Sequence, residues 1–189
     1  MKLIIIISLL LFSCSNAQQN QVNTIPQIAK QAYTYCQANN MDLEHCIFIN
    51  LNSHSGKYRF FIWDFNQQQI INKSLCCEGS CNYFKDTKKY SNRPNSYCSS
   101  LGKYKIGQRA PSRWGIGIHY KLHGLETANN NAYKRTIVLH SFNSIPNQEI
   151  YPNQLMYSQG CPTISNQKMH ELDQLLQTKS KPVLLWVFE

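Results

Sequence analysis

The stretch TIVLHSFNSIPNQEIYPNQLMYSQGCPTIS, residues 136–165, holds the residues that decide the fold and the chemistry of this chain. It opens with an apolar run, residues 136–139, which predicts a buried strand ending at His140. The rigid end of a strand is a good support for a catalytic imidazole. The stretch later reaches SQGCP, residues 158–162, where glycine permits a tight turn and proline fixes the direction of the outgoing chain.

Strands dominate the pattern outside this stretch. Short aromatic and β-branched runs predict strands over residues 46–51, 58–65, 70–76, 103–106, 116–122, 136–140 and 182–188. The first two runs read as a β-hairpin, and the polar segment 78–100 predicts a long surface loop. The expected class is therefore α+β, mainly β, with two peripheral helices.

The two helices are expected near the ends of the chain. Thr24 and Pro26 predict the start of the first helix, and Ser165 predicts the N-cap of the second. Apolar residues repeat at helical spacing at Ile25, Ile28, Ala29, Ala32 and Cys36, and again at Met169, Leu172, Leu175 and Leu176.

The first 17 residues predict a secretory signal. Lys2 precedes an apolar run, residues 3–12, that is shorter than the roughly 20 residues needed to span a bilayer. Two processing sites are open. Cleavage after Ala17 would release the protein, whereas a lipobox-like segment would end the signal at residue 13 and place a lipid anchor on Cys14. Both imply export to the periplasm or cell envelope.

The mature chain, residues 18–189, has the length of a single domain. Its charge stays strongly positive, because the net charge of +9 includes only Lys2 from the signal. An exported basic protein meets anionic envelope polymers or lipids rather than nucleic acid, so no nucleic-acid partner is expected. No pattern specifies the oligomeric state.

Seven cysteines follow the signal, and six of them lie between residues 36 and 98. Export permits disulfides, so these six are expected to be structural. The pairs that would close short loops are Cys36 with Cys46 and Cys81 with Cys98. The adjacent Cys76 and Cys77 are not expected to bond to each other. The spacing lacks the two separated Cys-x-x-Cys pairs typical of a zinc site.

Cys161 is left as the odd cysteine, and such a residue in an exported protein is a candidate reactive thiol. A thiol becomes nucleophilic when a nearby imidazole or backbone N–H groups favour its thiolate. His140 is the candidate base, and the N–H groups of Gly160 and Cys161 are candidates for an oxyanion hole. On residue types alone, a structural cysteine with an incidental histidine remains the favoured interpretation.

A second group of candidates lies outside this stretch. His119 and His123 fall on one face of a predicted strand, and Ser99 and Ser100 precede a Leu-Gly turn that could line a pocket. Each also has an ordinary structural interpretation. A zinc site built from His119, His123 and His140 is disfavoured, because two strand residues four positions apart stand about 13 Å apart. No metal or cofactor is expected.

The order of the residues resembles a known signature. His140-Ser141, sixteen further residues and Ser158-Gln159-Gly160-Cys161 resemble the murein L,D-transpeptidase catalytic domain family (YkuD-like), with Gln159 in place of a second His. The similarity is greater to a divergent branch that reads Ser-x-Gly-Cys-Pro. Further blocks similar to that branch are residues 96–102, 122–126, Asn130, Ala132, Arg135 and 137–140.

The resemblance implies an acyl transfer on the peptides of bacterial peptidoglycan. Cys161 would attack the carbonyl of a meso-diaminopimelate residue in a stem tetrapeptide and release the terminal D-Ala, and an amine of a second stem would resolve the thioester. His140 would move the proton, oriented by the Ser141 carbonyl, and Gly160 and Cys161 would supply N–H donors.

Substrate contacts are expected from Ser158, Gln159, His123, Ser99 and Ser100. Two departures concern this part of the site, because Met156-Tyr157 stand where the branch carries an Arg and Cys77-Glu78 stand where it carries a His-Gly pair. Two alternatives stay open. Water as the acceptor would make the protein an L,D-carboxypeptidase or amidase, and a silent thiol would leave a non-catalytic exported envelope-binding protein.

Overall fold

The computed structural model describes residues 24–81 and 90–189. The expected signal segment with Cys14, and residues 82–89 of the expected surface loop, lie outside the described residues. Within the described part of the chain, no helix is both long enough and apolar enough to span a membrane.

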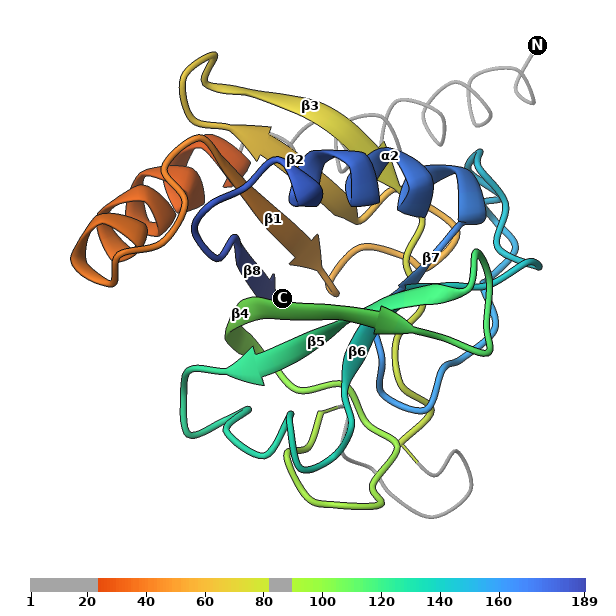
Figure 1. Ribbon diagram of the computed structural model, residues 1–189. Helices are drawn as coiled ribbons and strands as arrows, with labels where there is room; N and C mark the ends of the chain where they lie inside the picture. The colour runs from red at the N-terminus through yellow and green to blue at the C-terminus, as the bar shows by residue number, and fades with distance from the viewer. Residues whose placement is uncertain (1–23, 82–89) are drawn as a thin grey trace, which may run out of the picture.

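The described residues form one eight-stranded sheet (Figure 1). Its strands are β1 (His45–Asn50), β2 (Phe60–Asp64), β3 (Gln69–Ser74), β4 (Gly102–Pro111), β5 (Ile118–Gly124), β6 (Val138–Ser141), β7 (Thr163–Ile164) and β8 (Leu184–Phe188). They lie in the order β3-β2-β1-β8-β4-β5-β6-β7. The pairs β1–β8 and β6–β7 are parallel, and the other neighbours are antiparallel. The predicted α+β, mainly β class is confirmed.

The C-terminal strand β8 joins the two halves of the sheet. It runs parallel to β1 and antiparallel to β4, so it lies between the N-terminal hairpin and the half that carries residues 136–165 (Figure 1). Leu184, Leu185 and Val187 are all buried. Consecutive apolar residues suit this position, because both faces of a central strand are covered.

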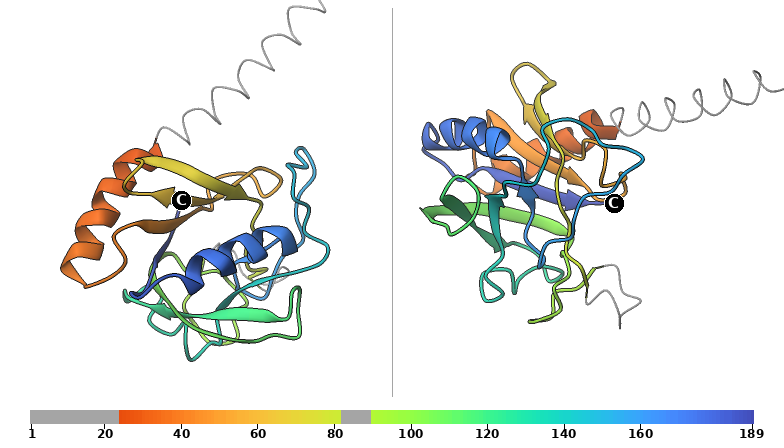
Figure 2. Two further views of the ribbon diagram at one scale, coloured as in Figure 1. Left: turned by 45° about the horizontal axis from the view of Figure 1, so that its top comes forward. Right: turned by 90° about the vertical axis from the view of Figure 1, so that its right-hand side faces the viewer.

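Two cores lie on opposite faces of the sheet, because successive side chains of a strand alternate in direction. Ile47 of β1 packs in the larger core with α2 (Asn166–Gln177). Phe48, the next residue, packs in a second core with the N-terminal helix, residues 24–38. Figure 2 shows the two helices on different sides of the sheet. Both are peripheral, as predicted.

The expected helix faces agree with the structure. The Ser165 side chain accepts a hydrogen bond from the Lys168 N–H as the N-cap of α2. Met169, Leu172 and Leu176 are buried, and Leu175 packs against the same core. In the N-terminal helix, Ile25, Ala29, Ala32 and Cys36 are buried. The expected start at Thr24 stays a prediction, because residue 23 lies outside the described residues.

Two strands differ from expectation by more than two residues at an end. The strand predicted over residues 103–106 continues to Pro111, because an irregularity between Ile106 and Arg109 lets β4 bend and keep its pairing with β5. Strand β7 was not expected at all. It contains only Thr163 and Ile164, too few residues to show any periodicity in the sequence.

The cysteine predictions need correction. Cys81 and Cys98 form a disulfide, as expected for a pair that closes a short loop. The other four cysteines of that half are buried free thiols, so the expectation of further structural disulfides, including Cys36 with Cys46, is wrong. Burial raises the pKa of the Cys36 thiol to about 12. A protonated buried thiol packs as a small apolar side chain, which removes the need for a bond partner.

Loss of a buried side chain from β8, the strand that joins the two halves of the sheet, should destabilise the whole domain. We expect Leu185→Ala to lower the free energy of unfolding by about 2–5 kcal/mol, because a fully buried leucine leaves a cavity in the larger core. Urea denaturation measures the change. Gln174→Ala on the exposed side of α2 is the control and should change it by less than about 0.5 kcal/mol. Equal effects of the two variants would contradict the assigned place of β8.

Candidate active site

The pairing of β6 with β7 brings His140 next to the segment that contains Cys161. The two strands are parallel, with His140 opposite Thr163 and Ser141 opposite Ile164. His140 and Cys161, 21 positions apart in the sequence, therefore line the same pocket, whose volume is about 470 Å³. Ser158 and Gln159 also line it, whereas apolar side chains such as Trp114, Phe142, Ile145 and Met156 form much of its remaining wall.

The two ring nitrogens of His140 have different partners. Nδ1 lies 3.0 Å from the Ser141 carbonyl oxygen, and Nε2 lies 3.2 Å from the hydroxyl oxygen of Thr163. A carbonyl oxygen can only accept, so Nδ1 carries a proton and Nε2 is the basic nitrogen of the neutral ring. Burial lowers the pKa of the imidazole, the bond to Ser141 raises it, and nearby His119 lowers it. The ring is thus held neutral near pH 7, as a general base requires.

Thr163 is a site residue that the sequence analysis missed. Its hydroxyl oxygen lies 3.1 Å from the Cys161 carbonyl oxygen and 3.2 Å from His140 Nε2. The hydroxyl has one proton, so it cannot donate to both acceptors at once. If Nε2 is protonated, it can donate to the hydroxyl while the hydroxyl donates to the carbonyl. The alternation of side chains in an extended segment, which places Thr163 on the side of Cys161, was the available signal.

The Cys161 thiol is half-buried and free. Its sulfur lies 3.9 Å from the Thr136 carbonyl oxygen, to which the thiol donates. Burial raises the pKa of the thiol, and the backbone of Val138 and the charge of Arg135 both oppose that rise. The thiol is therefore protonated at neutral pH. The hydrogen bonds of the described residues do not join the thiol to the imidazole, and bonds of this kind commonly tighten only when substrate binds.

Gly160 is required at its position for two reasons. Its φ is +104°, a conformation that other residues rarely adopt. A Cβ added there would lie 2.7 Å from the Cys98 carbonyl oxygen. The backbone of the turn is closed by Ser158, whose hydroxyl accepts from the Gly160 N–H at 3.1 Å and donates to the Cys161 carbonyl oxygen at 2.7 Å.

The expected oxyanion hole is corrected in one respect. Because the Gly160 N–H donates to Ser158, it does not point freely at a reacting carbonyl. The Cys161 N–H has no backbone acceptor among the described residues. Of the two donors expected from the sequence, Cys161 is the one that the hydrogen-bond pattern leaves available.

Residues 78–80 form backbone hydrogen bonds with Ser158, at the start of the turn that carries Cys161. The Ser158 N–H donates to the Glu78 carbonyl oxygen at 2.8 Å, and the Ser80 N–H donates to the Ser158 carbonyl oxygen at 2.9 Å. The disulfide between Cys81 and Cys98 then ties this segment to residues 98–100. The turn at residues 158–161 is therefore held by residues 78–81, which the disulfide links to residues 98–100.

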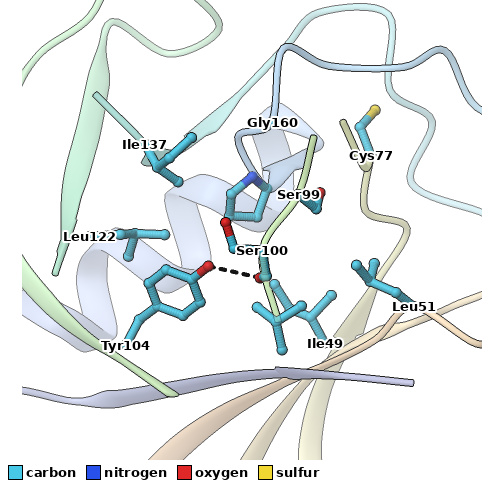
Figure 3. A pocket seen from close by; sticks show the side chains of 11 residues that line it. Ile49, Leu51, Cys77, Ser99, Ser100, Tyr104, Leu122, Ile137 and Gly160 are labelled. Carbon is cyan, nitrogen blue, oxygen red and sulfur yellow. Dashed lines mark hydrogen bonds between the residues drawn. The ribbon is translucent and has the colours of Figure 1, made fainter. Parts of the chain in front are cut away.

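Ser99 and Ser100 lie beneath the motif rather than in the pocket of Cys161. Figure 3 shows both beside Gly160, where they line a small cavity of about 10 Å³. The Ser99 hydroxyl accepts from the Gly79 N–H at 2.9 Å, and the Ser100 carbonyl oxygen accepts from the Tyr104 hydroxyl at 2.7 Å (Figure 3). Both side chains are buried. Their placement suits support of the turn better than contact with substrate.

His123 also lies apart from the pocket of Cys161. Its ring stacks on Tyr133 with 5.0 Å between the ring centres, on the face of β5 that carries His119. His119 is the residue that pairs with His140, and His123 lies four residues further along the strand. Of the expected site residues, the structure thus brings together Cys161, His140, Ser141, Gly160, Ser158 and Gln159, and it separates His123, Ser99 and Ser100 from them.

A group of potential metal ligands lies at the start of β1. Asp42, Glu44 and His45 offer ligand atoms within 4.8 Å of one another. The ammonium group of Lys179 contacts Glu44 and lies 3.9 Å from the Asp42 carboxylate. The lysine already lies against both carboxylates, so this group is interpreted as an ion-pair cluster.

A known protein family and several solved structures are similar to this chain. The model of the L,D-transpeptidase catalytic domain matches residues 17–186. Among solved structures, the chain is similar to Bd1075 of Bdellovibrio bacteriovorus, with 14% identity, a TM-score of 0.49, and coverage of 79% of this chain and 49% of that one. It is also similar to an L,D-transpeptidase of Xylanimonas cellulosilytica, with 13% identity, a TM-score of 0.42, and coverage of 76% and 59%.

An L,D-transpeptidase from Mycobacterium smegmatis is similar at 12% identity and a TM-score of 0.44, with coverage of 76% of this chain and 58% of that one. This chain therefore spans about half to three fifths of the length of these three proteins. No curated protein matches the sequence.

Substitution of Gly160 should lower the free energy of unfolding by more than the strain of its positive φ alone would explain. We expect Gly160→Ala to lower the free energy of unfolding by more than about 3 kcal/mol, because backbone strain of about 1–3 kcal/mol adds to the collision with Cys98. Gly117→Ala is the control, since Gly117 also has a positive φ, +80°, but has open space around its Cβ. Urea denaturation of both variants gives the comparison. Equal losses would show that the close approach to Cys98 is unimportant.

Proposed function

Because the chain belongs to the L,D-transpeptidase catalytic domain family, we propose that it transfers acyl groups of peptidoglycan stem peptides through a thioester on Cys161. The observation that carries this proposal is the parallel β6–β7 register, which places a neutral imidazole and a free thiol in one pocket. We also propose that a signal within residues 1–17 exports the chain and that residues 18–189 act as one catalytic domain in the periplasm or cell envelope.

The first half of the reaction forms the thioester. His140 Nε2 takes the proton of the Cys161 thiol, and the sulfur attacks the carbonyl carbon of the third residue of a stem tetrapeptide. The Cys161 N–H donates to the oxygen as it becomes negative. Collapse of this intermediate breaks the C–N bond to the terminal D-Ala, whose amine leaves with the proton from His140.

The second half transfers the acyl group. The amine of a second stem peptide attacks the thioester carbonyl, and His140 accepts a proton from that amine. The C–S bond breaks, and the sulfur recovers its proton from the imidazole. The product is a new amide cross-link and the enzyme in its starting state. The reaction exchanges one amide for another, so it needs neither an oxidant nor a cofactor.

Thr163 has a specific role in this scheme. The imidazolium formed in each half can donate from Nε2 to the Thr163 hydroxyl, which in turn donates to the Cys161 carbonyl oxygen. Hydrogen bonds to charged groups contribute about 1.5–3 kcal/mol. The hydroxyl therefore stabilises the state in which the sulfur has lost its proton.

Acylation of Cys161 can be tested with a tetrapeptide muropeptide and intact-protein mass spectrometry. We expect the wild-type chain to gain the mass of the acyl group and Cys161→Ala to gain none. Cys77→Ala is the matched control, because Cys77 is a free thiol that lines the same pocket. This variant should still be acylated.

The products of the same incubation separate the remaining candidates. Cross-linked dimers support the transpeptidase. Release of D-Ala without dimers would favour an L,D-carboxypeptidase on the same thiol. No adduct and no product from the wild-type chain would contradict the proposal and favour a non-catalytic envelope-binding protein.

The Thr163 hydroxyl can be tested through the pH dependence of acylation. We expect Thr163→Val to slow acylation about tenfold, because the imidazolium loses an acceptor. Burial holds the pKa of His140 below its ordinary value, so wild-type activity declines only as the pH falls through that lowered pKa. Loss of the acceptor lowers this pKa further, which moves the acid limb to lower pH. Thr163→Ser keeps the hydroxyl and should behave like the wild type; a shift to higher pH in Thr163→Val would contradict the role.

A further inference from the structure

Arg135 is a half-buried cation three residues before β6, the strand that carries His140. Its Nη1 donates to the Ser91 carbonyl oxygen at 2.9 Å and to the Ser100 hydroxyl at 2.6 Å. Its Nη2 donates to the Cys98 carbonyl oxygen at 2.6 Å and to the Ser96 hydroxyl at 3.3 Å. All four acceptors are neutral. Within residues 24–81 and 90–189, no carboxylate forms an ion pair with Arg135.

This arrangement differs from that of Arg59 and Arg109, two arginines that lie against carboxylates. Arg59 lies 3.2 Å from a Glu78 carboxylate oxygen, and Arg109 lies 2.7 Å from an Asp173 carboxylate oxygen. Neutral acceptors satisfy the N–H groups of a guanidinium but leave its charge unbalanced. An unbalanced charge away from water is costly unless an anion lies close by.

Two groups that can become anions act on Arg135, the Tyr104 hydroxyl and the Cys161 thiol. Burial raises the pKa of Tyr104 to about 12, so the thiol is the one left to ionise during the proposed reaction. Arg135 Nη2 lies 3.4 Å from the position that a Cβ on Gly160 would take, and Gly160 directly precedes Cys161. On the other side, Arg135 directly precedes Thr136, whose carbonyl oxygen accepts from the thiol. The charge of Arg135 opposes the burial that raises the thiol pKa, and the thiolate in turn favours the charged form of Arg135.

We propose that Arg135 is a positioning residue whose charge, paired with no carboxylate of the described residues, stabilises the Cys161 thiolate after His140 has taken the proton. The bond from Nη2 to the Cys98 carbonyl oxygen holds this charge beside Gly160. The role in catalysis rests on the proposed acyl transfer. The electrostatic effect on the thiol does not, because it is present without substrate.

The effect is measurable as the rate at which iodoacetamide alkylates Cys161 across the pH range. All variants carry Cys77→Ala, so that a second thiol of the same pocket does not contribute. We expect Arg135→Gln to raise the apparent thiol pKa by about one unit and to slow alkylation at neutral pH about tenfold, since only the thiolate reacts. Arg135→Lys keeps the charge and should retain most of the wild-type rate.

Two controls separate charge from support of the loop. Ser96→Ala and Ser100→Ala each remove one acceptor of Arg135 and leave its charge in place. Both should alkylate within about twofold of the wild-type rate. The inference is overturned if Arg135→Gln reacts like the wild type, or if either serine variant or Arg135→Lys reacts as slowly as Arg135→Gln. If Arg135→Gln fails to fold, Arg135→Lys still overturns the inference when it reacts about tenfold more slowly than the wild type, because the charge is kept.

The inference and the proposed function can fail separately. Suppose that alkylation of Cys161 depends on Arg135 as expected, but that a tetrapeptide never acylates the wild-type chain. The proposed acyl transfer and the catalytic role of Arg135 would then be wrong. The electrostatic effect of Arg135 on the thiol would stand. Normal acylation of the wild type, together with an alkylation profile that Arg135→Gln does not change, would remove the inference and leave the transferase.

Discussion

The two-residue parallel pairing of β6 with β7 is the constraint on which the rest of the site depends. It sets His140 opposite Thr163 and so places the imidazole beside the turn that carries Cys161. A pairing this short cannot hold itself together. Its stability comes from its surroundings, because Ile164 is fully buried and Ser165 directly begins α2, whose apolar side chains fill the larger core. Packing of the core thus fixes the register that the chemistry uses.

Burial acts on the thiol and the imidazole in opposite directions and leaves both neutral. It raises the pKa of Cys161 and lowers the pKa of His140, so a proton transfer between them creates two charges in a place that disfavours each. The structure supplies a group beside each charge. The Thr163 hydroxyl lies at His140 Nε2, and the Arg135 guanidinium lies beside Gly160. In the proposed mechanism, these neighbours make the charged pair accessible when substrate arrives.

Local patterns predicted the parts of the fold that local physics decides. Helical spacing identified the buried faces of both helices, the Ser165 cap was correct, and the apolar runs marked most strands. The family was expected from the resemblance of residues 140–162 and further blocks to its signature, and the family model over residues 17–186 confirms it. Pairing between distant segments leaves no local signal, so β7 and the support beneath Gly160 were missed. Thr163 was missed although the alternation of side chains after Cys161 pointed to it. For the same reason Ser99, Ser100 and His123 were grouped with a pocket that they do not line.

The central claim is that Cys161 and His140 rest as a neutral pair that ionises only when substrate binds. The most direct test is a titration of the His140 ring by nuclear magnetic resonance in the wild-type chain and in Cys161→Ala, without substrate. The account predicts an imidazole pKa below the ordinary value of about 6.5 that changes little when the thiol is removed. An imidazole pKa above that value in the wild type, which falls in Cys161→Ala, would reveal a resting thiolate–imidazolium pair and contradict the account.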